Sequence, residues 1–163
     1  LALPEAQGGR GLGIVASLPW VLFMAPGKWL GYTLFGFAAD TVGRRRSYAV
    51  FLVAAALLVP VFGSTRDLTW LLVLGPFVGF FGTGYFSGFG AVASELFPTE
   101  VRATAMGLTY NVGRGFSALA PCAVGWVAAR HSFSAAFLLV AAAFLLAAGL
   151  ALLLPETKGR PLE

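Results

Sequence analysis

The sequence predicts an all-α integral membrane protein with five transmembrane helices. Hydrophobic residues make up 58% of the 163 residues, charged residues make up only 11%, and the mean hydropathy is +0.83. Soluble domains of this size are far less apolar. The apolar residues form five long stretches separated by short charged connections, and runs such as 54–59 lack the alternation of barrel strands.

Each apolar stretch predicts one helix. The first is long enough to cross a bilayer, although Pro19 and Pro26 interrupt it. The third is rich in glycine, and four-residue spacings such as Gly75 with Gly79 and Gly84 with Gly88 permit close packing against a neighbour. The second and fifth are almost purely apolar, so we expect them to face lipid while the other three line an interior. The predicted spans are 14–38, 48–62, 68–92, 103–128 and 133–154.

Basic residues are distributed unevenly between the two ends of these spans. Lysine and arginine are enriched on the cytoplasmic side of membrane proteins. We therefore expect the loops 39–47, 94–102 and 155–163, and with them the C-terminus, to be cytoplasmic in a multi-pass protein of the cell membrane. Because these charges lie between apolar blocks, nucleic acid is not an expected partner. One end carries Arg44, Arg45, Arg46, Arg102, Lys158 and Arg160, and the other carries Arg10, Arg66 and Arg130.

Two basic residues, Lys28 and Arg114, lie inside predicted spans. A charge at the bilayer centre costs about 2.5 to 3.5 kcal/mol, so each needs a partner, water or a ligand. No acidic residue lies at that depth. We predict that these two residues, with Tyr32 and Asn111 on the same helix faces, bind an anionic solute. The alternative is that Lys28 snorkels beside Trp29 and that Arg114 donates to exposed backbone carbonyls.

Charged residues also lie at the ends of the predicted spans. Asp40 and Glu95 could pair with Arg102 and with the three arginines 44–46. Exposed pairs contribute at most about 1 kcal/mol each, but their making and breaking could bias two conformations. The alternative is that these charges only set the topology.

Nothing in the sequence indicates an enzyme. It holds no nucleophile with an adjacent base, no paired catalytic carboxylates, no phosphate loop and no metal-ligand cluster. Cys122 is the lone cysteine and lies in an apolar stretch, and His131 is the lone histidine. We expect no cofactor and no metal.

Three motifs resemble the major facilitator superfamily. They occur in the family's order and cover nearly the whole chain, which resembles the C-terminal half of sugar-porter-like and metabolite:proton symporter members. The resemblance implies helices eight to twelve of an incomplete six-helix bundle, in a fragment of a longer protein. The motifs are Gly36-x-x-x-Asp40-x-x-Gly43-Arg44-Arg45 between helices eight and nine, Glu95-Leu-Phe-Pro98-Thr99-x-x-Arg102 between helices ten and eleven, and Pro155-Glu156-Thr157-Lys158-Gly159 after helix twelve.

The resemblance also implies a function, secondary active transport of a small polar solute by alternating access. With Lys28 and Arg114 available, we expect a carboxylate-bearing metabolite, moved together with a proton whose carrier lies in the missing N-terminal half. Sugar porters usually place proline and tryptophan just before the loop glutamate, and 86–94 holds neither. A sugar transporter and a non-transporting five-helix scaffold stay as alternatives. The family further implies a conformational latch of Gly36, Asp40, Gly43, Arg44, Arg45, Glu95 and Arg102.

Overall fold

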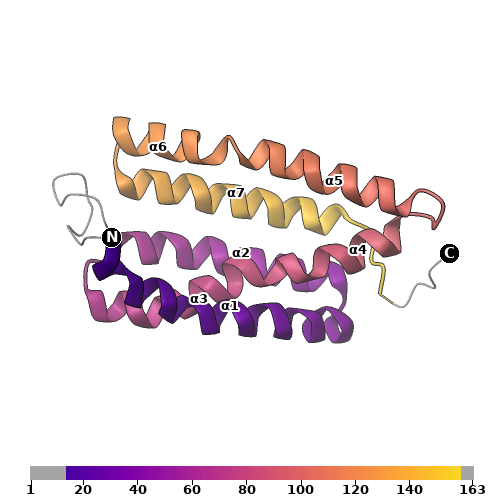
Figure 1. The fold of residues 1–163 in the computed structure, drawn as a ribbon, viewed down its shortest axis with the longest axis horizontal. Helices are drawn as coiled ribbons and strands as arrows, with labels where there is room; N and C mark the ends of the chain where they lie inside the picture. The colour runs from indigo at the N-terminus through magenta and orange to yellow at the C-terminus, as the bar shows by residue number, and fades with distance from the viewer. Residues whose placement is uncertain (1–13, 159–163) are drawn as a thin grey trace.

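The computed structural model describes residues 14–158. Every regular element among them is a helix, and the helices run side by side in alternating directions (Figure 1). Arg10, Arg160 and the last part of the predicted loop 155–163 lie outside the described residues. The elements are α1 (Ile14–Val42), α2 (Arg44–Ser64), α3 (Leu68–Gly84), the 3₁₀ turn η2 (Tyr85–Gly88), α4 (Phe89–Leu96), α5 (Arg102–Ser117), α6 (Ala120–Arg130) and α7 (Phe133–Leu153).

These elements form five long rods, because η2 joins α3 to α4 and a short break at 118–119 joins α5 to α6. Pro121 lies at the start of α6, where its missing N–H is tolerated. Four stretches within the described range are long and apolar enough to cross a membrane, namely Arg44–Ser64, Leu68–Leu96, Arg102–Arg130 and Phe133–Leu153. The helix α1 has the length but is not among the four. The prediction of an all-α membrane bundle with five helices is confirmed.

The helices extend beyond the apolar stretches that predicted them. The expected loop 39–47 is reduced to a turn at Gly43, since α1 continues to Val42 and α2 begins at Arg44. Apolar residues mark only the part of a helix that lies in lipid, and polar residues can continue the helix into the headgroup region. As a result, the charged residues of this turn lie on helix ends.

The close packing of α1 against α3 depends on glycine. A Cβ added to Gly27 would come within 2.0 Å of the Pro76 carbonyl oxygen, and one added to Gly31 within 2.4 Å of the Phe80 carbonyl oxygen. On the other side of the contact, Gly79 lies against the Met24 backbone. The glycines spaced four residues apart in the third span therefore allow α3 to pack closely against α1, as the sequence predicted.

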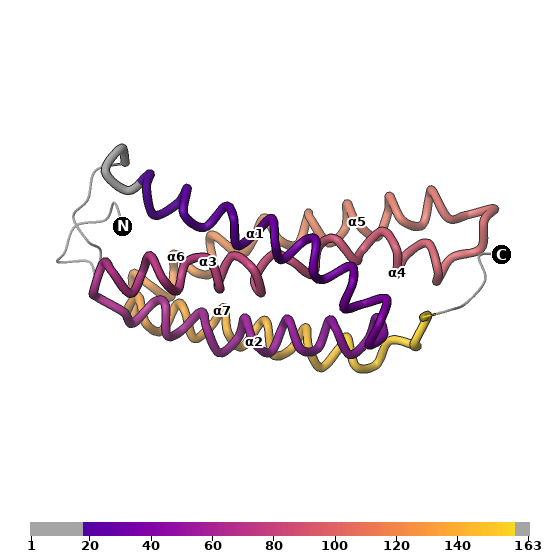
Figure 2. Tube along the Cα trace, turned by 90° about the horizontal axis from the view of Figure 1, so that it is seen from below, coloured from indigo at the N-terminus to yellow at the C-terminus, as the bar shows by residue number. Residues whose placement is uncertain are grey.

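The bundle has two sides. Figure 2 shows α2 and α7 running along one side and α5 on the other, while α1 crosses diagonally between the two sides and ends where α2 begins. The pair α2 and α7 packs through Leu52, Ala148 and Ala151, which are buried. Near the turn between α1 and α2, Phe35 is fully buried, and its ring lies 4.9 Å from that of Tyr48. This aromatic contact fixes the two helix ends that carry the charged residues.

Candidate charge network and solute site

The turn at Gly43 brings two charged residues together. Gly43 has φ of 111°, a value that favours glycine, and it reverses the chain between α1 and α2. Asp40 lies in the last turn of α1, and Arg44 is the first residue of α2. Arg44 Nη1 donates to Asp40 Oδ1 at 2.5 Å.

Arg44 also reaches the end of α4. Its Nη2 donates to Glu95 Oε1 at 2.9 Å, and its Nε lies 3.4 Å from Glu95 Oε2. The side chains of Arg44 and Glu95 are only 16% and 12% exposed, whereas that of Asp40 is 65% exposed. A two-point guanidinium–carboxylate contact shielded from water is stronger and more directional than an exposed pair. Glu95 is therefore the main partner of Arg44. Asp40 contacts Arg44 from the side that faces solvent.

The segment after α7 completes this contact. The Thr157 hydroxyl donates to Glu95 Oε2, and Thr157 is fully buried. We call Asp40, Arg44, Glu95 and Thr157 the charge network. Sequence reasoning did not select Thr157 as a site residue, although the motif at 155–159 pointed to its segment.

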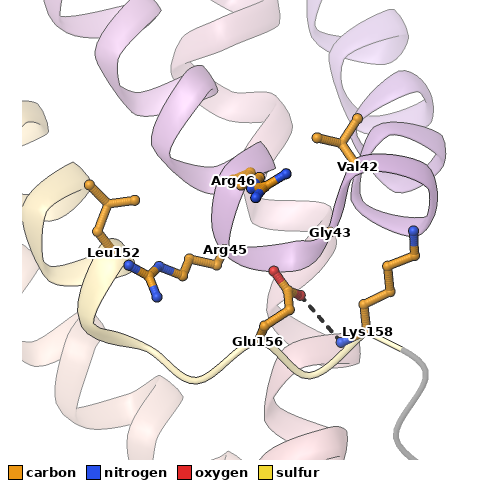
Figure 3. A pocket seen from close by; sticks show the side chains of 7 residues that line it. All are labelled: Val42, Gly43, Arg45, Arg46, Leu152, Glu156 and Lys158. Carbon is orange, nitrogen blue, oxygen red and sulfur yellow. Dashed lines mark hydrogen bonds between the residues drawn. The ribbon is translucent and has the colours of Figure 1, made fainter.

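Two further contacts attach the same segment to the turn. Glu156 Oε1 accepts from the Arg44 backbone N–H at 2.8 Å, and Lys158 Nζ donates to the Thr41 carbonyl at 2.5 Å. Desolvation raises the pKa of Glu156, but backbone N–H donors, that of Arg44 foremost, outweigh it and hold the pKa below 4.5. The backbone N–H of Lys158 also points at Glu156 (Figure 3).

The other predicted latch residues lie outside the charge network. Arg45 extends toward Leu152 on the far side of Glu156 (Figure 3). Arg102 Nε donates to the Phe97 carbonyl at 3.1 Å, which closes the connection between α4 and α5. Gly36 lies in α1 with open space where a Cβ would be. Three of the seven predicted latch residues thus touch one another directly, and Gly43 makes the turn between two of them.

The four predicted solute residues lie on two helices, Lys28 and Tyr32 on α1 and Asn111 and Arg114 on α5. Lys28 is half-buried on α1, and its Cγ would lie 3.1 Å from a Cβ at Gly79. Tyr32 is exposed on the same helix. On α5, Arg114 Nη1 lies 3.3 Å from the Tyr110 hydroxyl, and its guanidinium lies over the Tyr110 ring.

Asn111 Nδ2 donates to the Gly107 carbonyl at 2.8 Å, so the side-chain amide of Asn111 is hydrogen-bonded within its own helix. The helices α5 and α6 bury no residue within the described structure. No recorded contact joins Lys28 or Tyr32 to Asn111 or Arg114 in the described part of the chain. Their assignment to one solute site is still a prediction.

Residues 14–158 hold no group of three metal-ligating side chains. The contacts described at the Gly43 turn join carboxylates, a guanidinium, a hydroxyl and backbone amides. Such an arrangement can hold helix ends together and release them again.

Comparison with known proteins places the chain in a family. Residues 4–163 match the Major Facilitator Superfamily. A candidate metabolite transport protein of Haemophilus influenzae is 33% identical over 94% of this chain, and a candidate niacin/nicotinamide transporter of Bacillus subtilis is 34% identical over 100% of it. The cis,cis-muconate transport protein of Acinetobacter baylyi is 37% identical over 71% of the chain and 28% of its own length. The chain spans 38% and 41% of the length of the first two relatives. It belongs to the Major Facilitator Superfamily.

Proposed function

We propose that this chain is the C-terminal part of a secondary transporter that moves a small carboxylate-bearing metabolite together with a proton by alternating access. Membership of the family carries the proposal. The relatives support the substrate class, since niacin and cis,cis-muconate, which their names give as transported solutes, are carboxylic acids. A carboxylate is recognised well by guanidinium and ammonium groups.

Two cations of the chain are available to such a solute. Arg114 is exposed and its guanidinium contacts Tyr110, and neither Arg114 nor Lys28 takes part in the salt bridges found among residues 14–158. In a membrane each of these charges favours an anionic ligand. We therefore assign Lys28 and Arg114 to charge recognition, with Tyr32 and Asn111 as neighbouring hydrogen-bonding groups. The proton carrier would lie outside this chain, because the acidic residues within 14–158 lie at helix ends or in connections.

The charge network supports the alternating-access part of the proposal. It joins the α1–α2 turn, the end of α4 and the segment after α7 at one end of the bundle, which we assign to the cytoplasmic side. A contact that exists in one access state and breaks in the other biases the equilibrium between them. We propose this role for Asp40, Arg44 and Glu95, with Gly36, Gly43, Arg45 and Arg102 completing the latch.

The experiment is uptake by the full-length protein in proteoliposomes. We expect radiolabelled nicotinate or muconate to enter when an inward proton gradient is imposed and to stop entering when a protonophore is added. Lys28→Gln and Arg114→Gln should each abolish uptake without loss of folded protein. Arg130→Gln is the matched control, because the Arg130 guanidinium lies 4.7 Å from the Trp126 ring at the end of α6, far along the chain from the proposed site.

Three outcomes would contradict the proposal. Unchanged uptake in both variants would remove the anion site. Competition by neutral hexoses in place of carboxylates would favour sugar transport. Absence of any uptake by folded full-length protein, across both classes of solute, would favour the scaffold alternative.

A further inference from the structure

A depression of about 490 Å³ lies beside the charge network, where α1 ends, α2 begins and the chain leaves α7 (Figure 3). Its walls include the basic residues Arg45, Arg46 and Lys158 and the carboxylate of Glu156. Lys158 extends toward the end of α1 and Arg45 toward Leu152, and the Glu156 carboxylate lies between these two side chains (Figure 3).

The depression carries excess positive charge. Its lining holds three cations and one carboxylate. The carboxylate of Glu156 accepts from backbone N–H groups of Arg44 and Lys158. Both salt bridges recorded among residues 14–158 belong to Arg44. Arg45 and Arg46 are exposed and lie in neither of these salt bridges, and Lys158 Nζ donates to a neutral carbonyl. The site therefore favours an anion with several acceptor oxygens, and guanidinium groups match phosphate geometry well.

The position of the depression indicates where such an anion comes from. Two of the stretches able to cross a membrane border it, since one begins at Arg44 and another ends at Leu153. The depression thus lies at the level of lipid headgroups. Two exposed apolar side chains, Val42 and Leu152, form part of its wall. Basic pockets between membrane helices at this level bind phospholipid headgroups.

We propose that this depression binds a phosphate group, supplied by the headgroup of an anionic phospholipid. Arg45, Arg46 and Lys158 bind the phosphate oxygens, and Val42 and Leu152 contact the start of the acyl chains. The site is distinct from the four predicted solute residues and does not depend on which solute the protein carries. Because Glu156 lies both in this wall and against Arg44, bound lipid would also contact the segment that completes the charge network.

The test measures lipid binding to the full-length protein. Purified protein is placed in nanodiscs of phosphatidylcholine with increasing phosphatidylglycerol, and retained lipid is quantified by native mass spectrometry. We expect preferential retention of phosphatidylglycerol. Each of Arg45→Gln, Arg46→Gln and Lys158→Gln should lower its apparent affinity about fivefold, and the triple variant about a hundredfold. Arg66→Gln, at the opposite end of the bundle, is the matched control and should retain the affinity of the original protein.

Further variants and a competitor distinguish a lipid site from a folding defect and from a site for a soluble anion. Arg45→Lys with Arg46→Lys keeps the charge, so most of the affinity should persist. A loss in this lysine pair as large as that in the double variant Arg45→Gln with Arg46→Gln would show that the loss does not depend on charge, and would overturn the proposal. The proposal would also be overturned if the triple variant kept its affinity for phosphatidylglycerol, or if Arg66→Gln lost as much affinity as the triple variant. Inorganic phosphate that displaces phosphatidylglycerol at equal concentration would assign the site to a soluble anion and reject the lipid as its source.

Discussion

Arg44 and Glu95 are 51 positions apart in the sequence and are joined by two hydrogen bonds, at 2.9 and 3.4 Å. The contact links the beginning of α2 to the end of α4. Both side chains are largely shielded from solvent. Asp40 binds Arg44, and Thr157 binds Glu95, so four segments of the chain meet at this one ion pair.

Arg44→Gln should destabilise the protein. The change leaves the shielded Glu95 carboxylate without its cation, and we expect a cost of about 2 to 3 kcal/mol. The measurement is the thermal midpoint of the purified full-length protein in one detergent. Arg66→Gln removes an equal charge from an exposed connection and should shift stability by no more than about 0.5 kcal/mol. Equal midpoints for the two variants would show that the contact adds nothing to stability.

Thr157→Val tests the buried hydroxyl of the charge network. Valine keeps the shape of threonine but leaves Glu95 without one donor, and the expected loss is about 1.5 to 3 kcal/mol. Thr157→Ser keeps the hydroxyl, so its thermal midpoint should lie closer to that of the original protein. Combined with Arg44→Gln, the effect of Thr157→Val should be less than additive, because both residues bind the same carboxylate. Strict additivity in the thermal midpoints would contradict a shared network.

Gly43→Ala tests the turn. Alanine adopts φ of 111° only at a cost of about 1 to 3 kcal/mol, and its Cβ would come within 2.7 Å of Glu156 Oε2. We expect lower stability and weaker attachment of the segment after α7. Gly36→Ala is the matched control, because a Cβ there meets no atom within 4 Å and alanine favours the helix.

The Gly36 variant also bears on the latch. Stability equal to or above the original with slower uptake would support a role of Gly36 in contacts outside this chain. A Gly36→Ala variant that loses as much stability as Gly43→Ala would show that the packing around the turn differs from that described.

The sequence predicted the helices well, and it placed charged residues together at one end of the bundle. Long apolar stretches of fixed length leave little choice of fold in lipid, because the backbone must satisfy its own hydrogen bonds. A pairing of Asp40 with one of the arginines 44–46 could be expected because they share one short connection between two spans, and the structure shows that Arg44 makes it. The pairing with Glu95 could be expected once both were placed at the same end of antiparallel helices.

Other features needed three-dimensional information. The hydroxyl of Thr157 joins the network only because the chain folds back beneath the Gly43 turn after α7, and no periodicity predicts that return. Arg45 follows Arg44 directly but points elsewhere, since successive helical residues lie about 100° apart around the axis. Lys28 and Arg114 share only their charge and their depth within the predicted spans, and neither property tells how far apart α1 and α5 lie in the bundle.

Lowering the pH should weaken the attachment of the segment after α7. The pKa of Glu156 is lower in the folded protein than its usual 4.5, so its contribution is fully present above pH 4.5 and is lost as the pH falls through the folded value. Hydrogen exchange of the peptide that contains the Arg44 backbone amide measures this contact. At neutral pH the original protein should protect that amide more than Glu156→Gln does. The difference between the two should shrink below pH 4.5, and a constant difference would contradict the assignment.

Gly31→Ala should separate α1 from α3. An added Cβ would lie 2.4 Å from the Phe80 carbonyl oxygen, which is backbone and cannot rotate away, so the two helices must move apart. Overpacking of this kind costs about 1 to 3 kcal/mol, and the rings near Phe35 would lose contact as well. Gly107→Ala, on α5, meets no atom within 4 Å and should leave the thermal midpoint unchanged or raise it. If both variants behave alike, the helices α1 and α3 do not approach as closely as their glycines allow.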